Sequence, residues 1–128
     1  CSLHRTIRKQ MNYLDKIRRN LNAQESISFD YDGTISTRQG QALAKRFITK
    51  GYKVYIITAR PRRDSAPVLA VAKELGISEA RCFFTGSNKA KIEAIQIHKI
   101  TKHYDNNPEV VQELHDLGIN AQLVNYGN

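Results

Sequence analysis

Short apolar runs alternate along the chain with segments in which apolar residues recur every three or four positions. The runs are typical of strands, and the wider spacing is typical of amphipathic helices. The pattern predicts strands over residues 26–31, 53–58, 80–85, 101–105 and 119–124. It predicts helices between them, over residues 37–50, 65–75, 89–98 and 108–117. This alternation favours a parallel sheet covered by helices on both faces.

The predicted fold class is therefore α/β, a Rossmann-like three-layer α/β/α arrangement around a mostly parallel five-stranded sheet. Right-handed crossovers bring the carboxyl ends of all the strands to one edge of such a sheet. We expect the strand order 5-4-1-2-3, with the strand at residues 26–31 in the centre.

Residues 1–22 have the pattern of a further helix, with an apolar stripe and a basic opposite face. The stripe consists of Leu3, Ile7, Met11, Leu14, Ile17 and Leu21. We divide the chain into this basic amphipathic helix (residues 1–25) and an α/β domain (residues 26–128). Packing of the helix on the domain is the favoured interpretation, and a partner helix or a basic arm for nucleic acid are the alternatives.

The composition is that of an ordinary globular domain, with 128 residues, 41% of them apolar and 25% charged. No apolar run has the length of a membrane span, and no segment has the layout of a signal peptide. We therefore expect a cytoplasmic protein with no membrane partner. The two cysteines, Cys1 and Cys82, do not form a disulfide framework or a zinc site.

The charge is strongly basic, with 20 Lys and Arg against 12 Asp and Glu, a formal net charge of +8. Such an excess favours an anionic partner, either nucleic acid or a phosphorylated small molecule. The alternative is a basic chain that is merely well solvated.

Polar side chains collect where the predicted strands end. The sets are Asp30 and Asp32, then Thr58, then Thr85-Gly86-Ser87 followed by Lys89, and finally Asp105-Asn106. In a parallel sheet these groups converge on one crevice. Carboxylates bind a divalent cation, whereas lysine, hydroxyl groups and helix N-termini bind phosphate oxygens. Together they indicate phosphoryl transfer.

These segments resemble the four signatures of the haloacid dehalogenase-like phosphatase superfamily, and they occur in the family's order. Asp30-Tyr31-Asp32-Gly33-Thr34 resembles the first signature, and Ile56-Ile57-Thr58-Ala59-Arg60 resembles the second. Lys89 resembles the lysine of the third, and His103-Tyr104-Asp105-Asn106-Asn107-Pro108-Glu109 resembles the acidic cluster of the fourth. The match covers about residues 26–124.

The resemblance implies a role for each matched position. Asp30 is the expected nucleophile, and Asp32 is the expected general acid and then general base. Thr58 and the N–H group of Ala59 are expected to hold the phosphoryl group, with Lys89 paired to it. Lys91 is the alternative to Lys89, which we prefer because the first turn of a helix points at the crevice. Arg60 is expected either to contact substrate phosphate or to lie in solvent.

The resemblance also implies Mg²⁺, bound by the Asp30 carboxylate, the backbone carbonyl of Asp32 and Asp105. Asn106 stands where many members of the family have a second acidic residue. Its amide is expected to orient a metal-bound water. Glu109 either restores the missing charge or simply favours the helix N-terminus.

The short connections leave no room for the cap domain that many members of the family carry. We therefore expect an open, capless site that hydrolyses phosphomonoesters, with a nucleotide or a nucleic-acid end as the favoured substrate. One alternative is a basic nucleic-acid-binding module on the same scaffold with little or no activity. Another is a small-molecule phosphatase whose partner subunit acts as the cap, with the N-terminal helix as a possible site of oligomerisation.

Overall fold

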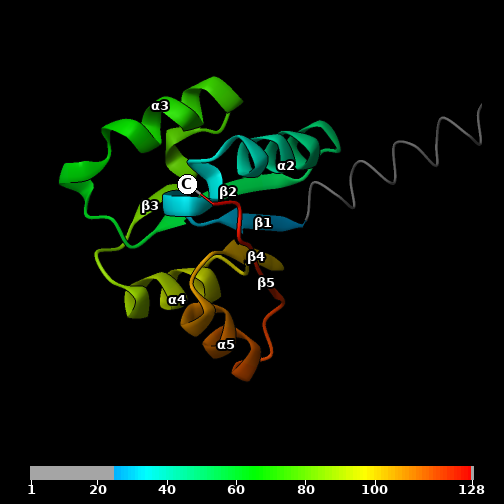
Figure 1. Cartoon of the computed structure of the whole chain (residues 1–128), viewed down its shortest axis with the longest axis vertical. Coiled ribbons are helices and arrows are strands. Elements are labelled where there is room, and N and C mark those ends of the chain that lie inside the picture. The colour runs from blue at the N-terminus through cyan, green and yellow to red at the C-terminus, as the bar shows by residue number, and fades with distance from the viewer. Residues whose placement is uncertain (1–24, 128) are drawn as a thin grey trace, which may run out of the picture.

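A parallel five-stranded sheet forms the centre of the computed structural model, which describes residues 25–127 (Figure 1). The strands are β1 (Ser26–Phe29), β2 (Lys53–Thr58), β3 (Cys82–Phe84), β4 (Lys102–Asp105) and β5 (Ala121–Leu123). Their order is β3-β2-β1-β4-β5, and all four pairings are parallel. This is the predicted order read from the other edge, so the predicted fold class is confirmed. The helix predicted over residues 1–22 lies outside the described residues.

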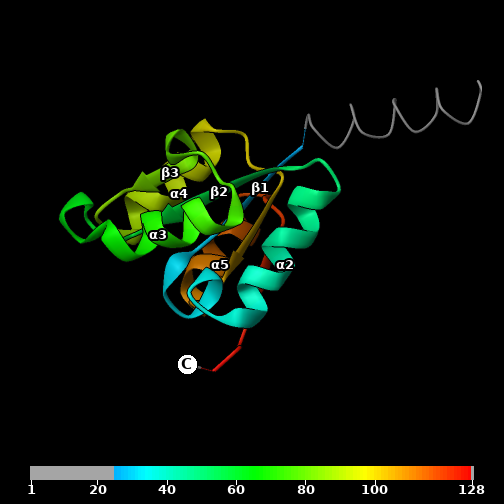
Figure 2. The same cartoon turned by 90° about the horizontal axis from the view of Figure 1, so that it is seen from above.

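In the part of the chain that the structure describes, four α-helices cover the two faces of the sheet. They are α2 (Arg38–Thr49), α3 (Ala66–Leu75), α4 (Asn88–Ile97) and α5 (Pro108–Asp116). Helices α2 and α3 lie on one face, and α4 and α5 lie on the other (Figure 1). Seen from above, the turn after β1 and the start of α2 lie beyond one end of the strands (Figure 2). Within residues 25–127, no helix has the length and apolar character needed to span a membrane.

The central strand β1 divides its side chains between the two faces by simple alternation. Ile27 and Phe29 pack in the core under α2 and α3, where Phe29 stacks on Tyr104 at a centroid distance of 5.0 Å. The core under α4 and α5 is built around Ile57, Ile95 and Leu114. The intervening positions of β1, among them Ser28, are polar and buried. A polar line therefore runs through the centre of the sheet on the α4 and α5 side.

The strand predicted over residues 26–31 ends earlier than expected, because residues Tyr31–Ile35 form a tight turn. Ile35 donates its N–H to the Asp30 carbonyl at 3.1 Å, and Gly33 takes a positive φ of 74°. The positive φ favours glycine, and a side chain at this position would also displace the Asn106 amide from the turn. The turn brings the loops after β1 and β4 into contact.

Candidate active site

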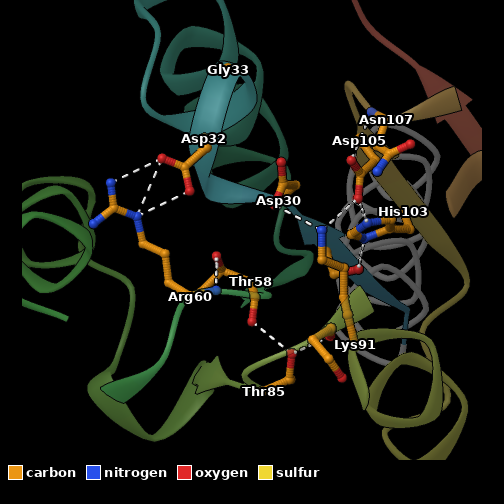
Figure 3. Close-up of polar contacts among 12 residues, drawn as sticks. Asp30, Asp32, Gly33, Thr58, Arg60, Thr85, Lys91, His103, Asp105 and Asn107 are labelled. Atoms are coloured by element: carbon orange, nitrogen blue, oxygen red, sulfur yellow. Dashed lines mark hydrogen bonds and ion pairs between the residues drawn. The ribbon is translucent and has the colours of Figure 1, made fainter. Parts of the chain in front are cut away.

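A pocket of about 210 Å³ opens at the carboxyl edge of the sheet. Its lining includes six predicted site residues: Asp30, Asp32, Thr58, Ala59, Asp105 and Asn106. Asn88, Lys91 and Asn107 complete the lining. The structure therefore brings together the ends of β1, β2 and β4 with the start of α4, as the strand-end pattern predicted (Figure 3).

The Asp30 carboxylate lies at the base of this pocket, and the residue is only 5% exposed. Its Oδ1 atom accepts a hydrogen bond from Lys91 Nζ at 2.9 Å. Burial and the negative charge of Asp105 raise the pKa of Asp30 to about 6, against the opposing effect of Lys91. Asp30 is thus an ionisable carboxylate in a buried, electrostatically compensated position, a setting that suits an oxygen nucleophile.

Lys91 occupies the position that we had expected Lys89 to fill. Lys91 Nζ donates to Asp30 at 2.9 Å and to Asp105 at 3.0 Å, and its side chain is 3% exposed. Lys89 is exposed and does not line the pocket. The expectation is corrected because the buried face of a helix, and not its first turn, decides which lysine reaches inward. Lys91 lies on the same face of α4 as the buried Ile95, which follows it by one helical turn. This spacing of four can be seen in the sequence.

The Asp105 carboxylate is fully buried and accepts three hydrogen bonds. Its Oδ2 atom receives Lys91 Nζ at 3.0 Å and His103 Nε2 at 2.9 Å. Its Oδ1 atom receives the backbone N–H of Asn107 at 2.9 Å. Burial alone raises the pKa of Asp105, but the hydrogen bond from His103 and the charge of Lys91 outweigh it and hold the pKa below its usual value. Asp105 is therefore the more firmly ionised of the two buried carboxylates.

Asp32 lies at the mouth of the pocket, with a side chain that is 59% exposed. Arg60 binds it in bidentate fashion, through Nη2 at 2.9 Å and Nε at 3.0 and 3.2 Å. The Arg60 guanidinium also lies 5.0 Å from the centroid of the Tyr31 ring. Of the two expectations for Arg60, free solvation does not hold, because the guanidinium is fixed on the candidate general acid.

Thr58 ends β2 with its hydroxyl group buried beside the pocket. Its Oγ1 atom accepts the Arg60 N–H at 3.1 Å. Its carbonyl oxygen accepts both the Thr85 N–H and the Thr85 hydroxyl at 2.9 Å. These bonds fix the loop that carries Ala59, so the pocket has a rigid wall opposite Asp105 (Figure 3).

The donors around the pocket fit Mg²⁺ by their chemistry. They are the carboxylates of Asp30 and Asp105 and the amide of Asn106, all hard oxygen donors. Lys91 occupies one oxygen of each carboxylate, which leaves Asp30 Oδ2 and Asp105 Oδ1 for a cation. Within residues 25–127, no three His, Cys, Asp or Glu side chains are grouped as metal ligands. The Asp32 carboxylate is turned to Arg60, and the backbone carbonyl of Asp32 as a metal ligand stays a prediction.

Comparison with known proteins places the chain in a family. The sequence profile of the haloacid dehalogenase-like hydrolases matches residues 27–126, and the chain belongs to that family. No curated protein matches it. Among solved structures, it is similar to one from Vibrio cholerae described as "putative 3-deoxy-D-manno-octulosonate 8-phosphate phosphatase", with 19% identity and a TM-score of 0.48. The similarity covers 77% of this chain and 64% of that one, so the chain spans less than two thirds of that protein.

Proposed function

We propose that this protein is a Mg²⁺-dependent phosphohydrolase that cleaves phosphomonoesters through an aspartyl-phosphate intermediate. The observation that carries the proposal is the buried pair of Asp30 and Lys91, 2.9 Å apart, at the carboxyl edge of the sheet. A carboxylate attacks a phosphate dianion only where cationic groups offset the repulsion between them. Lys91 supplies one such charge, and Mg²⁺ bound by Asp30 and Asp105 would supply the other.

In the first step, an Asp30 carboxylate oxygen forms a bond to phosphorus and the ester P–O bond breaks. Asp32 gives its proton to the departing oxygen, which leaves as an alcohol. In the second step, Asp32 takes a proton from water, whose oxygen attacks phosphorus. The acyl-phosphate P–O bond then breaks, which releases inorganic phosphate and restores the Asp30 carboxylate.

The phosphoryl group would be held at the wall formed by Thr58 and Ala59. The Thr58 Oγ1 atom already accepts the Arg60 N–H, and its own O–H has no acceptor among the described residues. The loop between β3 and α4 contains only residues 85–87, and α2 begins shortly after the turn that carries Asp32. These short connections support a capless, open site that admits a bulky substrate.

The charge distribution supports a nucleotide or a nucleic-acid end as the substrate. From Arg38 to Lys53 the chain has five Lys and Arg and no acidic residue. The other described residues have nine Lys and Arg against eleven Asp and Glu. The surplus of the described region therefore lies on α2, where Arg38, Lys45 and Arg46 are exposed. A basic helix face of this kind binds a phosphate backbone.

The same face favours a second candidate function, a nucleic-acid-binding module with little or no turnover. Binding that weakens steeply with salt, with no phosphate release, would support this second function. Turnover that depends on Asp30 would exclude it.

The test is Mg²⁺-dependent phosphate release by the wild type and by Asp30→Asn, with Asp116→Asn at the exposed end of α5 as the matched control. The substrates are 4-nitrophenyl phosphate, a set of nucleoside monophosphates, 3′- and 5′-phosphorylated oligonucleotides, and a phosphopeptide. We expect release that vanishes with EDTA and in Asp30→Asn and is unchanged in Asp116→Asn. A folded, Mg²⁺-supplied wild type that releases phosphate from none of them overturns the proposal.

A further inference from the structure

His103 is a fully buried histidine that lies directly behind the candidate metal ligand Asp105 (Figure 3). The two residues stand two apart on β4, so their side chains project from the same face of the sheet. His103 Nε2 lies 2.9 Å from Asp105 Oδ2. The proposed reaction makes no direct use of this ring, because Asp105 separates it from the pocket, whose lining does not include it.

Ser28 holds the other side of the ring. The parallel pairing of β1 with β4 sets Ser28 opposite His103, and Ser28 Oγ lies 2.6 Å from His103 Nδ1. Both residues are fully buried. Ser28 also shares its face of β1 with Asp30, two positions further along the strand. A buried polar line thus connects the two central strands beneath the pocket.

The chemistry of the acceptors fixes the direction of these bonds. An ionised carboxylate only accepts hydrogen bonds, so His103 Nε2 must carry the hydrogen that points to Asp105. In the neutral tautomer with its hydrogen on Nε2, Nδ1 is an acceptor. The Ser28 hydroxyl therefore donates to Nδ1. Ser28 thus donates to His103, and His103 donates to Asp105, so every donor in this chain of hydrogen bonds faces an acceptor.

The geometry at Asp105 leaves one position for a cation. Oδ2 accepts from both His103 and Lys91, whereas Oδ1 accepts only the Asn107 N–H. Lys91 also binds Asp30, so any movement of Lys91 with Asp30 would turn the Asp105 carboxylate. The bond from His103 comes from the same rigid strand as Asp105 itself and is independent of Asp30. Together with the bond from the Asn107 N–H to Oδ1, it holds the orientation of the carboxylate.

We propose that His103, oriented by Ser28, is a positioning residue that holds Asp105 with Oδ1 directed to Mg²⁺. The inference rests on the proposed function for the identity of the metal. A histidine that only fills the core would contribute to stability alone. A positioning residue also changes metal affinity, and donors behind a ligating carboxylate typically change it by about 10- to 100-fold.

The variants are His103→Phe, which keeps a ring but has no donor, and His103→Gln, whose amide N–H can still reach Asp105. Ser28→Ala removes only the group that orients the ring. Val68→Ala, in the core on the opposite face of the sheet, is the matched control for lost stability. The primary measurement is Mn²⁺ binding by electron paramagnetic resonance on each folded protein, supported by the Mg²⁺ concentration for half-maximal phosphate release.

We expect His103→Phe to weaken Mn²⁺ binding by about tenfold or more. We expect His103→Gln to recover most of this loss, Ser28→Ala to show a smaller loss, and Val68→Ala to bind as the wild type does. Wild-type affinity in folded His103→Phe overturns the inference. If His103→Phe does not fold, wild-type affinity in Ser28→Ala overturns it.

The outcome separates this inference from the proposed function. Weakened Mn²⁺ binding in His103→Phe, with no phosphate release by the wild type from any substrate, removes the proposed function and keeps the positioning role. An active wild type beside a His103→Phe variant with normal Mn²⁺ affinity removes only the positioning role.

Discussion

The two sides of the pocket hold their charges in opposite ways. On the inner side, Lys91 lies between Asp30 and Asp105, and all three side chains are less than a tenth exposed. On the outer side, Arg60 binds Asp32 with side chains that are 30% and 59% exposed. The shortest distance between nitrogen and oxygen is 2.9 Å on both sides, yet the surroundings differ. Water weakens the outer pair, whereas each inner charge depends on its partners.

This contrast separates groups that must stay fixed from a group that must move. In the proposed reaction, Asp30 and Asp105 keep their places, and rigid strands and α4 hold them. Asp32 exchanges protons with a leaving group and with water, and it lies on a turn at the open side. The loop that holds Arg60 follows β2, so the acid is positioned without being buried.

The largest effect is expected from Lys91→Met compared with Lys89→Met. The first change leaves two buried carboxylates without their cation, and breaking such a pair typically costs about 3–5 kcal/mol. It should also lower kcat by a factor on the order of 100 or more, because the charge that offsets Asp30 is lost. Urea unfolding and phosphate release provide the two measurements.

Lys89→Met is the matched control on the same helix, and its side chain is exposed. We expect its stability to change by less than about 0.5 kcal/mol. An equal loss in both variants would show that Lys91 does not carry the inner charge cluster.

The next effect is the pH dependence of stability from Asp30. Its pKa is about 6 in the folded protein against an ordinary 3.8, so the folded state binds this proton more tightly than the unfolded state does. Stability from this group is present below about pH 4 and is lost as the pH rises through 6. The full difference corresponds to about 3 kcal/mol.

Asp30→Asn removes this titration. In the presence of EDTA, the free energy of unfolding of Asp30→Asn relative to wild type should rise between pH 4 and pH 7. Urea unfolding at several pH values measures the difference, with Asp116→Asn as the control. A relative stability of Asp30→Asn that does not change with pH would contradict the assigned environment of Asp30.

The smallest effect on stability is expected at the outer pair. Arg60→Ala should lower the free energy of unfolding by less than about 1 kcal/mol, because exposed ion pairs contribute little. It should lower kcat by about tenfold, because Asp32 loses the bidentate guanidinium contact that orients it and acid–base catalysis depends on the position of the acid. Arg63→Ala, on the exposed turn nearby, is the control. A stability loss as large as that of Lys91→Met would remove the distinction between the two sides.

Much of the fold can be predicted from the sequence. Apolar runs and helical spacing mark the strands and helices of residues 25–127, and the handedness of crossovers gives the strand order. The third strand is shorter than predicted, because residues Glu79–Arg81 form a single turn before it begins. Local backbone hydrogen bonds determine where a strand begins and ends, and the pattern of apolar residues does not predict these bonds.

The sequence predicts those residues of the candidate site that lie at the carboxyl ends of strands. Asp30, Thr58 and Asp105 reach one pocket for that reason, although their chemical roles remain predictions. Position in the first turn of α4 favours Lys89, but the buried face of the helix carries Lys91 and decides which lysine enters the pocket. His103 lies beside Asp105 because the two residues stand two apart on β4. Its bond to Ser28 depends on the register between β1 and β4, which no local pattern contains.

The inner charge cluster also limits how this chain can change over time. Asp30, Lys91 and Asp105 come from three separate elements. Replacing Lys91 leaves two buried carboxylates without their cation, and replacing either carboxylate removes one of the two ion pairs of Lys91. A neutral version of the cluster therefore requires several substitutions at once, each harmful when it comes first. A descendant that has lost its substrate would retain these residues for the sake of folding. In such a lineage, Arg60 and Asp32 would be substituted before the buried cluster is. Their loss would therefore indicate loss of activity earlier than any change in the cluster would.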